Sequence, residues 1–348
     1  FGDTTAMTLK NAEGRTGRYI SQGTYRASVP ATLPFEPPLL IDDELQHLLS
    51  NADQAIGRLD AGSDMLPNPD LFVGTYVTKE AVLSSQMEGV TQASLAEVLE
   101  YEARGERPPN DIVEVMNYIH AMNYGLERVS ELPLSNRLIR EIHERLLRGV
   151  RGEEWQPGEF RRTQNWIGSP GSTIDTAAFV PPTPADMTEA MNTLEYYLHD
   201  EVKPVPVLIK AGLIHSQIET IHPFLDGNGR VGRLLVAFYL CQRGVMRRPL
   251  LYLSAFFSAY RDQYYERLQA VGDDGDVEGW MKFFLTAIWR VAESATKTVH
   301  KVLAIRDSHR QTIQDSLPRS GYGVQLLDIL FQRPYVNAKM VAERLEGS

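Results

Sequence analysis

Apolar residues recur at intervals of three and four along most of the chain, the period that places side chains on one face of an α-helix. Ile112, Val115 and Ile119 recur in this way. The pattern predicts an all-α fold. Helices are expected over residues 42–59, 70–76, 78–88, 110–129, 135–147, 186–198, 208–221, 260–271 and 277–306, and from 230 onward.

Two stretches break this helical period. Residues 152–184 are rich in glycine and proline, and the short runs 163–168 and 178–180 flank a glycine–serine turn, which predicts a β-hairpin. A hairpin in an otherwise helical chain is more often a binding loop than a core element. Residues 1–39, rich in Gly, Thr, Ser and Pro, are expected to form an irregular surface arm.

The end of the chain predicts two short helices separated by a turn. Val324, Leu327 and Leu330 would form the apolar face of the first, and Val341 and Leu345 that of the second. This order is typical of the opening of a helix-turn-helix, as in winged-helix proteins. DNA binding and a helical hairpin used for packing or dimerisation both remain open, so DNA and a homodimer partner are both conceivable.

Composition and charge exclude some classes of protein. The 348 residues, 43% of them hydrophobic, suffice for a sizeable core and for two or three domains. A net charge of -10 argues against a dominant non-specific nucleic-acid surface. The single cysteine, Cys241, fits a reducing compartment, and the sequence shows neither an export signal nor a run of 18 apolar residues. A cytoplasmic protein without membrane contact is expected.

The chemically informative residues lie in one break between two predicted helices, residues 222–229. His222 stands at the end of the first helix, and Asp226 follows four residues later. A glycine-rich loop that opens a helix presents backbone N–H groups at the positive end of the helix dipole, so it is an anion site. Arginines on the next turn extend that site to a polyphosphate. The residues expected to bind the phosphates are Gly227, Asn228, Gly229, Arg230 and Arg233.

Two other interpretations of this stretch are weaker. GNGRVG, residues 227–232, satisfies the GxGxxG pattern of dinucleotide-binding folds, but the preceding residues are helical and no acid follows about twenty residues later. His215, Glu219 and His222 have a spacing that can hold a metal ion. Because Pro223 ends the helix and a further ligand besides Asp226 is not obvious, His215 and Glu219 are better explained as structural hydrogen-bonding residues.

The preferred interpretation is a phosphate-transfer site. His222, neutral at physiological pH, suits a general base that takes a proton from an incoming hydroxyl. Asp226 can hold Mg²⁺ together with nucleotide phosphates, because Mg²⁺ uses one or two protein carboxylates plus phosphate oxygens. No covalent nucleophile is needed, since positioning and charge stabilisation suffice.

The segment HPFLDGNGRVGR matches in full the signature HxFx[DE]GNGRxxR, and the chain therefore resembles the Fic (filamentation induced by cAMP) family. The predicted hairpin followed by FVPP looks like that family's flap. The resemblance implies a Fic-fold helical bundle that transfers AMP from ATP to a hydroxyl of a target protein. It implies His222 as the base, Asp226 as the Mg²⁺ ligand and Asn228 in the α-phosphate cradle. Arg230 would then meet the β-phosphate and Arg233 the γ-phosphate.

A second motif bears on regulation. SSQMEG, residues 84–89, by itself reads as a solvated glutamate beside a glycine that ends a helix. Beside the Fic signature it resembles the family's inhibitory motif [ST]xxxE[GN], carried by Ser84, Glu88 and Gly89. The resemblance implies that Glu88 pairs with Arg233 and so blocks the γ-phosphate. In some relatives the same glutamate supports removal of AMP.

Contacts with the base and the target have fewer candidates. Tyr264 and Tyr265 offer aromatic faces for adenine and ribose, and the flap residues Ile167 and Phe179 could line the groove for the target.

The expected organisation is an N-terminal region (1–109) with the inhibitory helix (78–89), a Fic core (110–275) and C-terminal helices with a partial helix-turn-helix (276–348). The core would hold the flap (about 160–182) and the active-site loop (222–233). The implied enzyme is an autoinhibited nucleotidyltransferase acting on Ser, Thr or Tyr of a target protein, or on itself. De-AMPylation, another nucleotidyl or phosphoryl transfer, and a DNA-binding regulator with a nucleotide-sensing core are the alternatives.

Overall fold

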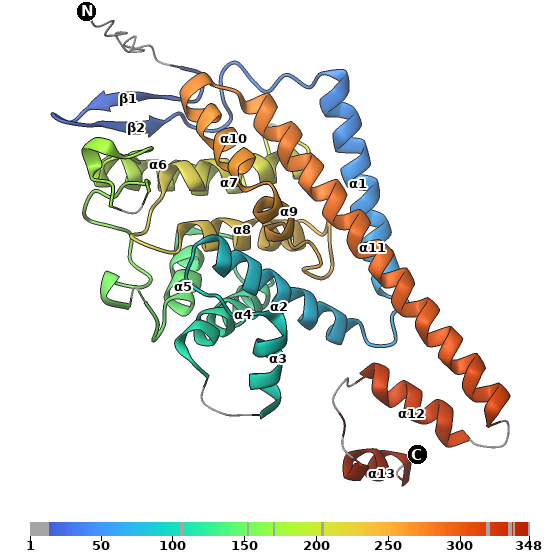
Figure 1. The fold of residues 1–348 in the computed structure, drawn as a ribbon. Helices are drawn as coiled ribbons and strands as arrows, with labels where there is room; N and C mark the ends of the chain where they lie inside the picture. The colour runs from blue at the N-terminus through green and yellow to red at the C-terminus, as the bar shows by residue number, and fades with distance from the viewer. Residues whose placement is uncertain are drawn as a thin grey trace, which may run out of the picture.

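A computed structural model describes residues 14–104, 108–151, 153–169, 171–202, 205–317, 321–332, 336 and 338–346. The described chain is mostly helical, which confirms the all-α prediction (Figure 1). The strands are β1 (Gly17–Ser21) and β2 (Arg26–Pro30). The α-helices are α1 (Asp43–Ser63), α2 (Pro69–Met87), α3 (Leu95–Arg104), α4 (Asn110–Val129), α5 (Asn136–Leu146), α6 (Pro184–His199), α7 (Val207–Ile221), α8 (Asn228–Gln242), α9 (Ser254–Ala259), α10 (Arg261–Asp274), α11 (Val277–Ser316), α12 (Gly321–Gln332) and α13 (Ala338–Glu346). Short 3₁₀ turns occupy Glu153–Trp155 and Ile174–Thr176.

Helices α7 and α8 form the centre of the molecule. Every residue of α8 from Asn228 to Leu240 is buried, which explains why its apolar run has little helical periodicity. Helix α8 packs against α2, α4 and α5, whereas α7 packs against α6, α10 and α11. Helices α7 and α8 are therefore surrounded by other helices, which fix the two ends of the loop that joins them (Figure 1).

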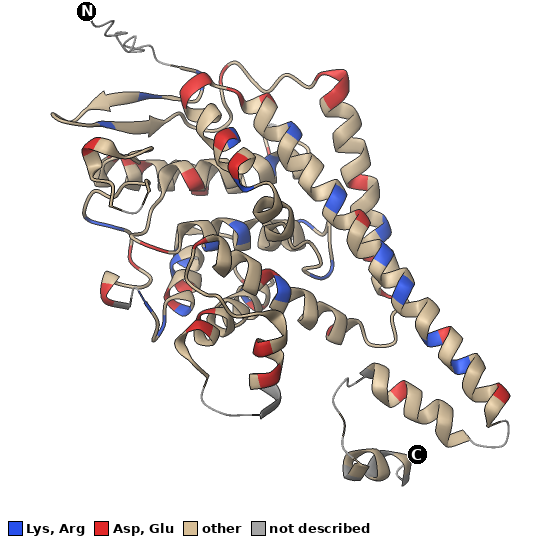
Figure 2. Ribbon diagram, in the orientation of Figure 1, with Lys and Arg blue, Asp and Glu red and all other residues tan. Residues whose placement is uncertain are grey.

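The long helix α11 packs along α1 over much of its length (Figure 1). Asp42 caps α1 by accepting a hydrogen bond from the Leu45 amide, as its place before the first apolar residue predicts. The same carboxylate accepts a hydrogen bond from Lys282 of α11 at 2.8 Å. Figure 2 shows acidic and basic residues interspersed along α11, with no long run of lysine and arginine alone.

The prediction of two helices over 70–76 and 78–88 was wrong, because α2 is continuous. The helix starts where the sequence breaks, with Asn68 accepting a hydrogen bond from the Leu71 amide and Pro69 at the first position. Thr75 and Thr78 donate their hydroxyls to carbonyls one turn earlier within the helix. Their hydrogen bonds thus stay inside α2, and the β-branched residues do not interrupt it.

The β-structure also differs from the prediction. The arm expected to be irregular contains the antiparallel pair β1–β2, in which Tyr19 lies opposite Ser28. The predicted hairpin contracts to a single bridge, in which Ile167 and Phe179 exchange two backbone hydrogen bonds of 2.8 and 3.1 Å. The Ser28 amide donates to the Val180 carbonyl at 2.9 Å, so β2 is attached to the end of the flap. Helices α3 and α9 were not predicted.

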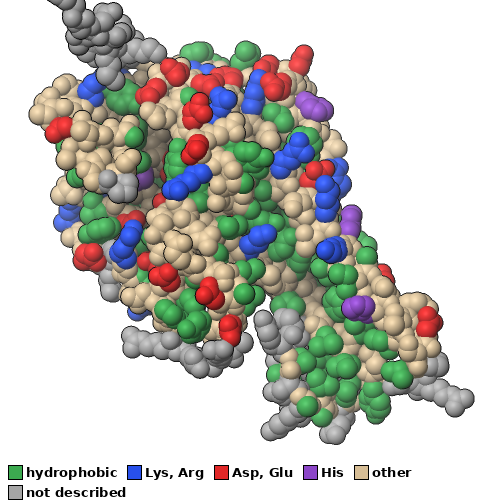
Figure 3. All heavy atoms as spheres, in the orientation of Figure 1, with side chains coloured by type: hydrophobic (Ala, Val, Ile, Leu, Met, Phe, Trp, Pro, Cys, Tyr) green, Lys and Arg blue, Asp and Glu red, His purple; other side chains and the backbone are tan. Residues whose placement is uncertain are grey.

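Helices α12 and α13 follow the far end of α11 (Figure 1). Figure 3 shows hydrophobic side chains gathered on the surface of this region, where Tyr322 is 64% and Leu330 40% exposed. The helix-turn-helix stays a prediction, because residues 333–335 and 337 lie outside the described chain. Within the described residues, no helix combines the length and the apolar character needed to cross a bilayer.

Candidate active site

The loop between α7 and α8 is built by two left-handed residues and one side-chain clamp. His222 ends α7 with φ +49°, and Gly227 precedes α8 with φ +77°. The Asn228 side chain accepts a hydrogen bond from the Phe224 amide and donates one to the Phe224 carbonyl, both at 2.8 Å. The side-chain amide of Asn228 is thus engaged in closing the loop, which leaves its backbone N–H as the group available for the predicted phosphate contact.

His222 is held in one tautomer. Its Nδ1 lies 3.3 Å from the Glu219 carbonyl, which can only accept, so Nδ1 carries the proton and Nε2 has a free lone pair. Burial disfavours the charged ring and lowers the pKa of His222 to about 4. The imidazole is neutral at pH 7 and can accept a proton at Nε2.

His143, which the sequence analysis missed, supports the loop from α5. Its Nδ1 accepts a hydrogen bond from the Gly158 amide at 2.9 Å, so its Nε2 donates to the Asp226 carbonyl at 3.0 Å. The ring stacks on Phe224 with centroids 3.7 Å apart. The only signal in the sequence was a polar residue on the apolar face of a predicted helix.

Arg230 is fully buried and has a carboxylate partner that the sequence analysis also missed. It donates to Glu114 of α4 at 2.7 Å, and its other terminal nitrogen lies 3.6 Å from the Asp226 carboxylate. One oxygen of Asp226 and one terminal nitrogen of Arg230 are buried without a hydrogen-bond partner. The site thus holds an unsatisfied acceptor and an unsatisfied donor side by side.

This donor set fits Mg²⁺ bound together with phosphates. Among the described residues, no cluster of three or more metal-ligating side chains exists. Mg²⁺ in nucleotide sites takes one or two carboxylates and fills its other positions with phosphate oxygens and water. Asp226 Oδ2, which faces Arg230 at 3.6 Å but accepts no hydrogen bond, can supply the protein ligand of such an ion.

Helix α2 reaches the site with its C-terminal end. Arg233 donates from Nη2 to Glu88 at 2.7 Å and from Nε to the Ser84 hydroxyl at 2.8 Å. The Arg233 side chain is 1% exposed and that of Glu88 25%. Burial would raise the pKa of Glu88, but Arg233 outweighs it, so that pKa is lowered and Glu88 is ionised. The ion pair predicted between Glu88 and Arg233 is present.

Two glycines shape this contact. Gly89 ends the helix with φ +66°, as predicted for a residue that follows a helix C-terminus. A Cβ on Gly229 would lie 2.3 Å from the Glu88 carboxylate oxygen. Glu88 therefore sits directly over the first turn of α8, where an anion is favoured by the helix dipole.

The two tyrosines expected beside the base differ in exposure. Tyr264 is 1% exposed, and its hydroxyl lies 2.9 Å from His215 Nε2, which places it in the core and corrects its expected contact with adenine. Tyr265 is 41% exposed and keeps an accessible ring. Glu219 lies 3.9 Å from His215, and burial raises the pKa of Glu219 to about 8, so both residues are structural and uncharged at pH 7.

The flap covers the loop from its other side. Asn165 donates to the Phe224 carbonyl at 2.9 Å, so the base of the flap is tied to the loop. Ile167 is 36% exposed at the bridge, and Phe179 opposite it is half-buried. Both predicted docking residues thus lie on the flap with part of their surface accessible.

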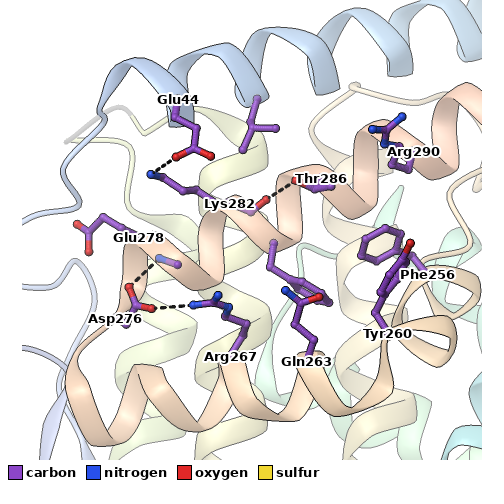
Figure 4. A pocket seen from close by; sticks show the side chains of 13 residues that line it. Glu44, Phe256, Tyr260, Gln263, Arg267, Asp276, Glu278, Lys282, Thr286 and Arg290 are labelled. Atoms are coloured by element: carbon purple, nitrogen blue, oxygen red, sulfur yellow. Dashed lines mark hydrogen bonds and ion pairs between the residues drawn. The ribbon is translucent and has the colours of Figure 1, made fainter.

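A separate groove of about 960 Å³ lies between α1, α9, α10 and α11 (Figure 4). Its Lys282 is paired with Glu44 at 2.5 Å, and its Arg267 with Asp276 at 3.2 Å (Figure 4). Two of its cations are thus already neutralised by neighbours. The α7–α8 loop, with its unsatisfied buried groups and neutral histidine, is the better candidate for chemistry.

Comparisons with known proteins agree with this choice. Two family models match the chain, Fic/DOC family N-terminal over residues 46–127 and Fic/DOC family over residues 133–240. Protein adenylyltransferase Fic of Drosophila grimshawi is 33% identical over 175 residues, which are 49% of this chain and 32% of that protein. The protein of the same name from Aedes aegypti is 30% identical over 185 residues, 52% of this chain and 33% of that protein. The chain spans about a third of these relatives.

Solved structures share the fold. A Fic family protein from Desulfovibrio desulfuricans G20 superposes with a TM-score of 0.63 at 21% identity, covering 89% of this chain and 91% of that one. A Fic domain containing signaling protein from Bacteroides thetaiotaomicron gives a TM-score of 0.55 at 19% identity, covering 74% of this chain and 97% of that one.

Proposed function

Because the chain belongs to the Fic/DOC family, we propose that it transfers AMP from ATP to a hydroxyl side chain of a target protein. The observation that carries this proposal is a neutral His222 beside the amide-rich start of α8, with Arg230 and Arg233 on the same turn. Two relatives that are about 30% identical over half of the chain are named protein adenylyltransferase.

In the proposed reaction the target hydroxyl attacks the α-phosphorus of ATP. A bond forms between the hydroxyl oxygen and the α-phosphorus, and the bond from that phosphorus to the bridging oxygen of the β-phosphate breaks, so pyrophosphate leaves. His222 accepts the hydroxyl proton at Nε2, the atom left free by the hydrogen bond at Nδ1. No covalent enzyme intermediate is required.

The surrounding groups bind and orient the phosphates. The N–H groups of Gly227, Asn228 and Gly229 would cradle the α-phosphate, as donors at a helix N-terminus do. The unpartnered nitrogen of Arg230 would donate to the β-phosphate, and Arg233 to the γ-phosphate. Asp226 would hold Mg²⁺, which neutralises the phosphate charge when it is bound.

In this structure Arg233, the residue proposed to bind the γ-phosphate, already has other partners. Arg233 binds Glu88 and Ser84, and the carboxylate stands over the start of α8, the place proposed for a phosphate. We infer that Glu88 inhibits transfer by competing with the γ-phosphate for Arg233. A charge-assisted hydrogen bond contributes about 1.5–3 kcal/mol, which corresponds to roughly a 10- to 100-fold effect on rate.

Labelled ATP tests the proposal. With Mg²⁺ and ATP labelled at the α-phosphate, wild-type protein should label a protein band weakly, and Glu88→Gly should label it roughly 10- to 100-fold faster. The exposed Glu131→Gly is the matched control and should behave as wild type. His222→Ala in the Glu88→Gly background should abolish labelling.

The same assay separates the alternatives. If ATP labelled at the γ-phosphate labels the protein and ATP labelled at the α-phosphate does not, the reaction is phosphoryl transfer and not AMP transfer. Release of AMP from a pre-labelled target that requires Glu88 would assign the reverse reaction. Absence of any label in wild type and in Glu88→Gly, with a cell extract supplying targets, would overturn the proposed transfer.

A further inference from the structure

Arg161 is a buried cation at the start of the flap, and the proposed chemistry does not use it. Arg161 is 3% exposed, and within the described residues all of its side-chain hydrogen bonds go to backbone carbonyls. Nε donates to the His222 carbonyl at 2.9 Å. Nη2 donates to the Pro182 carbonyl at 2.5 Å and more weakly to that of Ile221 at 3.4 Å, and Nη1 donates to that of Thr163 at 3.3 Å.

Arg161 forms no ion pair within the described chain, unlike Arg230 and Arg233 in the same site. Burial lowers the pKa of Arg161 to about 10, so the guanidinium remains charged at pH 7. Its charge faces the C-terminal carbonyls of α7, where the helix dipole favours a cation. The end of α7 therefore takes the place of a carboxylate partner.

The carbonyls that Arg161 binds belong to two segments. Ile221 and His222 are the end of α7, whereas Thr163 and Pro182 are the two sides of the flap base. The Arg161 amide adds a third link to the active-site loop, donating to the Pro223 carbonyl at 2.9 Å. One planar guanidinium thus joins both sides of the flap base to the residue that ends α7.

His222 needs such support because its backbone is in the left-handed region, at φ +49°, which is unfavourable for a residue with a Cβ. The orientation of its ring depends on that backbone, since Nδ1 donates to a carbonyl one turn earlier in α7. A shift of the His222 carbonyl would move Nε2 away from the position at which it accepts a proton.

We propose that Arg161 is a positioning residue that fixes the His222 backbone and couples it to the flap, so that flap movement on target docking changes the placement of Nε2. This inference rests on the proposed role of His222 as a base. Lysine cannot replace the arginine fully, because an ammonium group lacks the planar fork that reaches carbonyls on both segments at once.

The charged groups that act on His222 give the proposal a second readout. The Arg161 charge lowers the pKa of His222, while Glu88 from α2 and Asp226 from the loop raise it, and burial lowers it most. Removing Arg161 takes away a nearby positive charge and loosens the covering flap. Both changes raise the pKa of His222 from about 4 toward its ordinary value of about 6.5.

The kinetic test uses Arg161→Gln and Arg161→Lys in the Glu88→Gly background, with the neighbouring exposed Arg162→Gln as the matched control. Arg161→Gln should lower kcat by roughly 100-fold, the effect of a displacement of about 1 Å in a reacting group, while KM for ATP stays within about twofold. Arg161→Lys should recover part of kcat, and Arg162→Gln should match its parent.

An NMR titration supplies a readout that does not require turnover. With ¹³C-labelled histidine, and the His222 resonance identified by its loss in His222→Gln, Arg161→Gln should raise the His222 titration midpoint by at least about one pH unit. Arg161→Lys serves for the kinetic measurement if Arg161→Gln does not fold, whereas the titration needs Arg161→Gln because lysine keeps the positive charge. An unchanged His222 midpoint in Arg161→Gln, or a rise in KM for ATP at constant kcat, would overturn the positioning role. Failure of every variant to transfer AMP would overturn the proposed function instead.

Discussion

At the scale of single residues, the sequence predicted the partner of one signature arginine and missed that of the other. Arg233 has the expected partner, Glu88. Arg230 was assigned to the nucleotide alone, yet it is bound to Glu114, a residue 116 positions earlier. A buried arginine without any hydrogen-bonding partner costs several kcal/mol, so a partner was required on physical grounds. Its identity depends on how α4 packs against α8, which no local pattern specifies.

The pH dependence of transfer tests the state of His222. An ordinary histidine base would lose activity below about pH 6.5, because its ring becomes protonated. Since the pKa of His222 is lowered to about 4, the deprotonated base persists below pH 6.5 and is lost only as the pH falls through about 4. In Glu88→Gly, initial rates at low ATP should therefore stay flat between about pH 5.5 and pH 7.5.

Circular dichroism at each pH is the control for folding. A fall in rate centred near pH 6.5, with the protein still folded, would show that the ring of His222 titrates as in water and would contradict its buried, neutral state.

At the scale of elements, the sequence predicted best where one face of a helix is apolar. Helices α4, α5 and α6 lie within two residues of their predicted bounds, because each has a clear apolar face and a capping or turn residue at its start. The position of the loop between α7 and α8 was also predicted correctly, because the motif is contiguous. The β1–β2 pair was not predicted. The segment is rich in Gly, Thr and Ser, and its strands pair with each other, so the sequence lacks the alternating apolar pattern of a strand packed on a core.

Site residues supplied by distant elements could not be predicted. His143, Glu114 and Arg161 each make a contact with the loop or with α8 that spans at least 61 positions, and none belongs to a recognisable motif. Tyr264 was misjudged for a related reason: an aromatic residue on α10 looks the same in sequence whether it faces the nucleotide or His215.

Helix packing behind the loop gives a test of stability. A Cβ on Gly125 of α4 would lie 2.2 Å from the ring of Phe238 of α8, so Gly125→Ala should lower the free energy of unfolding by about 1–3 kcal/mol. Gly74 of α2 is exposed with nothing within 4 Å of its Cβ position, and Gly74→Ala should raise that free energy by about 0.5–1 kcal/mol.

Urea denaturation followed by circular dichroism measures both variants. If Gly125→Ala were as stable as wild type, α4 and α8 would be able to move apart at low cost. The packing of α4 would then not hold α8 rigidly in place.

At the scale of the whole molecule, one hydrophobic core connects the proposed regions. Buried residues from Phe35 to Val299 form a single cluster. Helix α2, which ends next to Glu88, and helix α8, which carries the signature arginines, therefore share a core and are not separate folding units. The predicted domain boundaries at residues 109 and 275 stay a prediction. Because the core is shared, the part of the described chain that forms it is expected to unfold cooperatively.

The C-terminal helices are the exception. Helix α12 packs chiefly on α11 and α13, and the shared core ends at Val299. A chain ending at Leu317 should therefore bind ATP with the affinity of the full chain, within about twofold, in isothermal titration calorimetry of the Glu88→Gly variant. A loss of more than tenfold would mean that α12 and α13 support the nucleotide site directly.

The hydrogen bond from Ser28 to Val180 bears on the choice of recombinant fragments. The two family-model matches together span 46–240, and a fragment cut to those limits would retain the signature, the flap and Glu88. It would also release the flap from β2 and strip α7 of its packing against α10 and α11. Such a minimal domain would present a looser flap than the full chain, and its selectivity for targets would describe the fragment and not the protein.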